Sequence, residues 1–155
     1  MIQQQQKTAG AQGDYDYTKP HTYPRSGRDL VGGVAYLGRA IDKMRADING
    51  TAGEYIAACP QSRKVHALWG VLPEKFKEGV QQQPTDEGVL RWLQEHGPEQ
   101  PTQDKIKSFS EEMLAAGPTA EMSEWFKNQL KEMGHPDRTD IKTFVDLQDL
   151  EEERL

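Results

Sequence analysis

Apolar side chains recur at steps of three and four in the first strongly patterned part of the chain. The series is Val34, Leu37, Ile41, Met44 and Ile48. Residues at these steps lie on one face of an α-helix, so the series predicts a single apolar stripe. We expect a helix over about residues 29–48 that ends at Asn49-Gly50, because Asn and Gly favour helix C-termini.

Prolines mark where the next two helices begin. Pro60 is well placed as a first helical residue with Cys59 as the N-cap, and Pro73 begins another segment. Proline suits this position because the first backbone N–H of a helix has no intrahelical partner. We therefore expect helices over about residues 60–69 and 73–80.

Three Pro-Thr pairs, each 17 residues after the last, mark three further helices. The pairs are Pro84-Thr85, Pro101-Thr102 and Pro118-Thr119, and Gly97, Gly117 and Gly134 follow as terminators. Each threonine is a credible N-cap, since its hydroxyl can accept a hydrogen bond from the first turn. We attribute the spacing to shared helix-end signals rather than to a true repeat, because a unit of this length holds only one helix. A last short helix is expected from about residue 140.

Alternating apolar patterns typical of strands are nearly absent, so we predict an all-α fold. The expected architecture is a compact multi-helix domain of about six to seven helices. Residues 1–24 are aperiodic and include Pro20 and Pro24, which predicts a flexible or extended leader. Residues 25–155 are predicted to form a single helical domain with a core of modest size.

Charge is unevenly divided between the two halves of the chain, whose net charge is −6. Residues 1–66 hold 9 basic and 6 acidic side chains, a net +3, whereas residues 67–155 hold 10 and 19, a net −9. The acidic total argues against a nucleic acid as the main partner, because phosphates require a basic surface. The positive N-terminal half is compatible with a local anion site.

Several features narrow the cellular context. No apolar run approaches the roughly 20 residues that span a bilayer, and the N-terminus lacks the apolar core of a secretory signal. The single cysteine rules out an internal disulfide framework. We therefore expect a cytoplasmic protein without a membrane partner. Because the four histidines show no metal-ligand spacing, we also expect no metal and no cofactor.

The first predicted helix combines glycine with ordered charge. Arg39, Asp42 and Arg45 are three residues apart, so Asp42 is expected to pair with both arginines along one helix flank. Gly38 lies on the same flank, where a missing side chain lets another backbone or a small ligand approach. A glycine inside a helix destabilises it by about 1 kcal/mol relative to alanine, so we expect a close approach of this kind to explain Gly38.

An anion site at the beginning of this helix is the functional interpretation. Gly32 and Gly33 are expected in the first turn, where free N–H groups favour a phosphate or carboxylate, and Arg25 and Arg28 lie just upstream. The structural interpretation is simpler and carries more weight. In it, the charges fix a neighbouring loop and Gly38 admits a packed helix.

Cys59 is a second candidate, because it is expected at a helix N-terminus with Arg63 and His66 on the following turns. That setting lowers the pKa of a thiol and makes it reactive. Since Cys59 and His66 are two turns apart, a direct pair is not expected, and we favour a small, buried and inert cysteine.

A family resemblance is carried by a cluster of short motifs. They are Pro24-Arg25-Ser26, Gly32-Gly33, Leu37, Arg39, Ile41-Asp42-Lys43, Arg45-Ala46, Gly53-Glu54-Tyr55 and Cys59-Pro60. With these motifs the chain resembles, over about residues 23–155, an uncharacterised bacterial family of small helical proteins catalogued as a domain of unknown function. The resemblance implies a cytoplasmic bacterial protein and a helical fold, and it supplies no activity and no catalytic residue.

Three functions are compatible with these observations. The leading hypothesis is a small soluble helical binding or interaction domain with a site for a small anion or metabolite beside the first helix. Its candidate ligand-binding residues are Arg25, Arg28, Gly32, Gly33, Arg39, Asp42, Arg45, Glu54, Tyr55 and Cys59. The alternative is a small enzyme with Asp42 or Glu54 as general base and arginines that stabilise an anion. The third is a structural protein whose acidic C-terminal half docks onto a basic partner, and the oligomeric state stays open.

Overall fold

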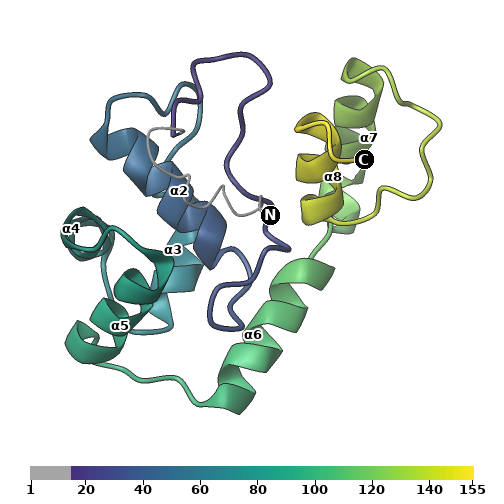
Figure 1. The fold of residues 1–155 in the computed structure, drawn as a ribbon. Helices are drawn as coiled ribbons and strands as arrows, with labels where there is room; N and C mark the ends of the chain where they lie inside the picture. The colour runs from purple at the N-terminus through teal and green to yellow at the C-terminus, as the bar shows by residue number, and fades with distance from the viewer. Residues whose placement is uncertain (1–14) are drawn as a thin grey trace.

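A computed structural model describes residues 15–155 as a set of helices joined by loops (Figure 1). In chain order these are α2 (Leu37–Ile48), α3 (Pro60–Ala67), α4 (Pro73–Gln82), α5 (Asp86–His96), α6 (Gln103–Ala115), the short 3₁₀ helix η2 (Ala120–Met122), α7 (Ser123–Glu132) and α8 (Phe144–Glu151). Within the described range no strand forms beyond an isolated bridge between Val31 and Val34. The predicted all-α fold is therefore confirmed. None of these helices is long and apolar enough to cross a membrane.

Most helix beginnings follow the local signals in the sequence. Pro60 and Pro73 are the first residues of α3 and α4, as predicted. Thr85 and Thr102 cap α5 and α6 by accepting hydrogen bonds from backbone N–H groups three residues later. Thr119 is the N-cap residue of the short η2 rather than of α7, which begins only at Ser123, and its side chain accepts no capping hydrogen bond within residues 15–155.

The last helix also begins later than expected. α8 starts at Phe144 rather than near residue 140, because its N-cap is Thr143. The Thr143 hydroxyl accepts from the Asp146 N–H at 3.0 Å, and the Asp146 carboxylate accepts from the Thr143 N–H at 3.1 Å. This reciprocal capping box satisfies backbone groups that would otherwise need water.

The predicted start of the first helix is wrong. α2 begins at Leu37 rather than near residue 29, because Gly32, Gly33 and Tyr36 have left-handed backbones, with φ of 59°, 80° and 69°. This conformation cannot continue a right-handed helix. Gly32 and Gly33 therefore lie in turns before the helix and not in its first turn. The buried Tyr36 ring occupies the space where a Cβ at Gly27 would lie, 2.5 Å from its Cζ atom.

Two groups of buried apolar residues organise the chain. The larger group joins α2 through α6 around Trp69, Phe76 and Leu93, and α8 adds Val145 to it. The smaller group consists of Phe126, Leu130, Ile141, Leu147 and Leu150. Figure 1 shows the corresponding pair of helices, α7 and α8, on the far side of α6 from α4 and α5.

Residues 15–24 lie against the loop between α2 and α3 and against the residues that follow α8. The Tyr17 N–H donates to the carbonyl of Thr51 at 2.8 Å, and the Tyr17 ring meets the Tyr55 ring edge to face at 5.5 Å. Arg154 donates to the carbonyl of Pro24 at the other end of this segment. Residues 1–14 of the predicted leader lie outside the described residues, and the predicted division after residue 24 stays a prediction.

Candidate functional site

Arg25 explains the glycine inside α2. Its guanidinium donates two hydrogen bonds of 3.0 Å to Asp42 and bonds of 2.8 and 3.0 Å to Asp86. A Cβ at Gly38 would lie 3.1 Å from the Arg25 Cζ, so Gly38 admits this side chain rather than a packed helix or a ligand. Both oxygens of Asp42 are engaged by Arg25, which leaves Asp42 unsuited to the role of general base.

The helix spacing predicted a pair between Arg39 and Asp42, and this prediction is wrong. Arg39 pairs instead with Glu152, in the C-terminal part of the chain. It donates to both carboxylate oxygens of Glu152, at 2.8 and 2.7 Å, and these two side chains are only 6% and 2% exposed. The Tyr55 hydroxyl donates to the same carboxylate at 2.7 Å, and the Arg39 guanidinium lies over the Tyr55 ring. Burial raises the pKa of Glu152, but the hydrogen bonds and charge of Arg39 outweigh it, and the pKa is lowered.

The two remaining arginines of the predicted site are also engaged within the chain. Arg28 donates to Asp149 at 2.6 Å and to Asp146 in α8. Arg45 donates to the carbonyls of Val80 and Gln83 at the C-terminus of α4, at 3.2 and 2.8 Å, and makes no pair with Asp42. The arginine groups that the sequence assigned to an anion therefore hold the fold together.

Gly32 and Gly33 face other helices. A Cβ at Gly32 would lie 2.5 Å from the side chain of Leu90 in α5, and the carbonyl of Gly33 accepts a hydrogen bond from Ser110 of α6 at 2.8 Å. Ser110 also accepts from the N–H of Ala35 at 2.9 Å. Gly32 thus lets the turn before α2 approach α5, and Gly33 supplies the left-handed backbone of that turn, so neither glycine requires a ligand.

Lys43 is the residue that the sequence analysis missed as a site residue. It lies one turn after Arg39 on α2, and its Nζ atom is 3.0 Å from the Sγ atom of Cys59. Lys43 is only 5% exposed, yet none of the ion pairs formed within residues 15–155 includes it. The i+4 spacing from Arg39 was the available signal, because it places Lys43 on the same helix face as Arg39.

Cys59 is the N-cap residue of α3, as predicted, and it is partly rather than fully buried. Its sulfur lies 3.5 Å from the hydroxyl of Ser62 in the first turn. Burial raises the pKa of the Cys59 thiol, but the Lys43 charge and the Ser62 hydrogen bond outweigh it and lower the pKa to about 7. For Lys43, whose charged form is the protonated one, burial lowers the pKa. Lys43 and Cys59 therefore form a partly buried pair of titratable groups, in which the charge of Lys43 favours the thiolate of Cys59.

His66 does not take part in this pair. Its Nδ1 atom donates to the carbonyl of Val71 at 2.8 Å, and its ring stacks on Phe76 at 4.7 Å. Burial lowers the pKa of His66, which favours the neutral ring. The cation beside the sulfur is thus Lys43, from α2, and not a residue of α3 itself.

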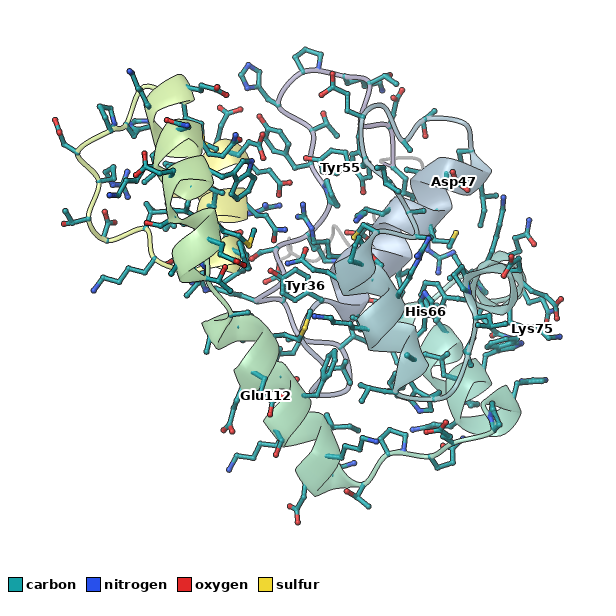
Figure 2. The ribbon with its side chains drawn as sticks, turned by 180° about the vertical axis from the view of Figure 1, so that it is seen from behind. Tyr36, Asp47, Tyr55, His66, Lys75 and Glu112 are labelled. Carbon is teal, nitrogen blue, oxygen red and sulfur yellow. The ribbon has the colours of Figure 1, made fainter. Side chains whose placement is uncertain are left out.

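The loop between α2 and α3 contacts both the Arg39–Glu152 pair and Lys43. Tyr55 contacts the Arg39–Glu152 pair, Cys59 contacts Lys43, and Glu54 and Ile56 are exposed. In Figure 2, Tyr55 and Tyr36 lie between the C-terminal helices and the rest of the molecule, and His66 is on α3. No group of three or more His, Cys, Asp or Glu side chains suited to a metal occurs in the described part of the chain.

Comparison with known proteins identifies the family. Residues 21–154 match the family described as "Domain of unknown function (DUF5069)", so the chain belongs to it. The resemblance stated from the motifs of the N-terminal half is confirmed. No curated protein matches the chain.

Proposed function

We propose that this domain binds a small anion beside α2, where Lys43 meets the start of α3. The proposal keeps the function expected from the sequence, a helical binding domain with an anion site next to its first long helix. It moves the site one turn along α2 from Arg39, to Lys43 and the start of α3, because the arginines bind within the chain.

The burial of Lys43 without a carboxylate partner is the observation that carries the proposal. A buried ammonium group is costly unless it is paired and hydrogen-bonded. Lys43 has three N–H donors, and its hydrogen bond within residues 15–155 is to the Cys59 sulfur. Two donors are thus left for an oxygen anion, whereas Arg25, Arg28 and Arg39 each have carboxylate partners.

The start of α3 adds further donors for the same anion. Among residues 15–155, no side chain accepts a capping hydrogen bond at the start of this eight-residue helix, and the proline at its first position brings no N–H. The N–H groups of Gln61 and Ser62 are therefore the first ones of the helix, where the dipole favours negative charge. A phosphate or a carboxylate group satisfies both requirements, because each presents several oxygens that accept hydrogen bonds.

Thermal unfolding with inorganic phosphate tests the proposal. Phosphate is added at constant ionic strength to the wild type, to Lys43→Met and to Lys64→Met, which removes the same charge from an exposed position of α3. We expect phosphate to raise the Tm of the wild type and of Lys64→Met, since a ligand that binds only the folded state stabilises it. The Tm of Lys43→Met is expected to stay constant. An equal rise in all three proteins, or no rise in any, would contradict the proposal.

A further inference from the structure

We infer that Cys59 is a nucleophilic thiol that reacts with hydroperoxides, and that Lys43 stabilises the oxygen that leaves. The inference rests on the proposed anion site, because the same ammonium group would bind the anion and assist the reaction. It adds a covalent step and a class of reactant to that site.

The geometry supplies three requirements of a reactive cysteine. Cys59 is partly exposed, it lies at the N-terminus of α3, and the Lys43 ammonium group is 3.0 Å from its sulfur. The thiolate is the nucleophilic form of cysteine, and each neighbour favours it. The groups that face the sulfur are Lys43 from α2 and Ser62 from α3, and the Arg39–Glu152 pair acts on Lys43 from the same face.

The reaction is a two-electron oxidation of sulfur. A lone pair of the Cys59 thiolate attacks one peroxide oxygen, the S–O bond forms and the O–O bond breaks. The departing oxygen leaves as alkoxide or hydroxide and takes a proton from the Lys43 ammonium group, which regains one from water. The products are a sulfenic acid at Cys59 and an alcohol or water, so sulfur is oxidised and the peroxide is reduced.

Two observations favour a hydroperoxide over a larger electrophile. Ser62 is buried beside the partly buried Cys59, and the loop that ends at Cys59 packs Ala57 against the core, which favours a small reactant over a large one. The negative charge of the reaction develops on an oxygen next to the sulfur, where Lys43 has two unused N–H donors. Cys59 is the single cysteine of the 155 residues, so the sulfenic acid would be reduced by an external low-molecular-weight thiol.

Oxidation by hydrogen peroxide at pH 7, with a dimedone trap and intact-protein mass spectrometry, tests the inference. The wild type and Lys64→Met are expected to react at the same rate, and Cys59→Ser not to react. Lys43→Met is expected to react at least about tenfold more slowly, because a thiol with an ordinary pKa of ~8.5 is only a few per cent thiolate at pH 7. Lys43→Arg keeps the charge and is expected to recover most of the rate.

A spectroscopic readout keeps the inference falsifiable if Lys43→Met fails to fold. The ultraviolet absorbance of the thiolate in the wild type is expected to titrate with a midpoint at about pH 7. A midpoint near pH 8.5 or above, or equal rates for the wild type and a folded Lys43→Met, would overturn the inference.

Phosphate titration of Cys59→Ser separates the two proposals. If phosphate stabilises this variant but the wild-type thiol reacts slowly, the covalent step is wrong and the anion site stands. If the wild-type thiol reacts rapidly but phosphate never stabilises the protein, the thiolate chemistry stands and the proposed binding function is wrong.

Discussion

Helices α2 through α6 enclose a core of 21 buried residues that includes Val145 of α8, whereas α7, α8 and the loop between them share a group of five. The larger group is held by apolar contacts among neighbouring helices. The smaller group is joined to it through Val145 and through hydrogen bonds and ion pairs that span more than 100 residues of sequence. These polar links are Arg28–Asp149, Arg39–Glu152, Ser26–Asp149 and Tyr36–Gln148.

The comparison shows that the basic residues near α2 differ in role: the arginines stabilise the fold, whereas Lys43 is proposed to bind an anion. The arginines attach the C-terminal helices or fix the loops around α2, so substitutions there are expected to change stability. Within the described residues Lys43 makes no such attachment, and it contacts Cys59, the one cysteine of the chain. Its substitution is therefore expected to change binding and reactivity.

The largest effect is expected from cavities in the two cores. Leu93→Ala, in the large group, is expected to lower the free energy of unfolding by about 3–5 kcal/mol, because Leu93 is fully buried. Leu130→Ala, in the small group, is expected to lower it by about 2 kcal/mol, since fewer buried neighbours surround it. Urea denaturation followed by circular dichroism measures both. Equal losses would mean that the two groups do not differ as described.

The next effect concerns the buried ion pair between the regions. Arg39→Met is expected to cost about 3 kcal/mol, because it leaves the Glu152 carboxylate buried and without its main partner. Combining it with Glu152→Gln is expected to restore at least half of that loss, since no uncompensated charge is left. A double-mutant cycle by urea denaturation measures the coupling, with Lys64→Met as a control within about 0.5 kcal/mol of the wild type. Strictly additive losses would show that the pair is not coupled.

Acid is expected to loosen α8 before the large core. The pKa of Glu152 is lowered in the folded state, so the pair contributes stability above the unfolded pKa of about 4.3 and loses it as the pH falls through the folded value. Hydrogen exchange of backbone amides, corrected for intrinsic rates and measured from about pH 6 to about pH 3, should show protection in α8 lost before that in α5. Loss of protection in both helices at the same pH would contradict this, and Glu152→Gln should remove the difference.

The smallest effect tests the reason for Gly38. Alanine is the better helix former by about 1 kcal/mol, but its Cβ would lie 3.1 Å from the Arg25 guanidinium, which Asp42 and Asp86 hold in place. We expect Gly38→Ala to destabilise the wild type by about 1 kcal/mol and to stabilise an Arg25→Met background by a similar amount. Thermal unfolding of the four proteins gives the sign. The same sign in both backgrounds would refute the explanation.

The parts of the fold that the sequence predicted depend on local signals. Pro60, Pro73, Thr85 and Thr102 act within one turn of the helices that they begin, so their roles can be read from neighbouring residues. The start of α2 was not predicted because Tyr36 adopts a left-handed backbone. Tyrosine has no particular preference for this conformation, so the sequence gives no signal of it. The buried ring and its hydrogen bond to α8 hold it there, and both are tertiary contacts.

The partners of the charged residues could not be predicted in the same way. A helical wheel compares residues three or four positions apart, and it paired Asp42 with Arg39 and Arg45. The partner of Asp42 is 17 residues earlier in the chain, and that of Arg39 is 113 residues later. Lys43 and Cys59 are likewise brought together only by the loop between α2 and α3.

The most direct test of the account locates the anion on the molecule. Backbone amide resonances of the isotope-labelled protein are followed by NMR while inorganic phosphate is added at constant ionic strength. The account expects changes concentrated at Gln61 and Ser62 and at Lys43, with the amides of Arg39 and Arg45 unchanged. Changes centred on Arg39 and Arg45, with none at Ser62, would place the anion on the arginine flank and contradict the account.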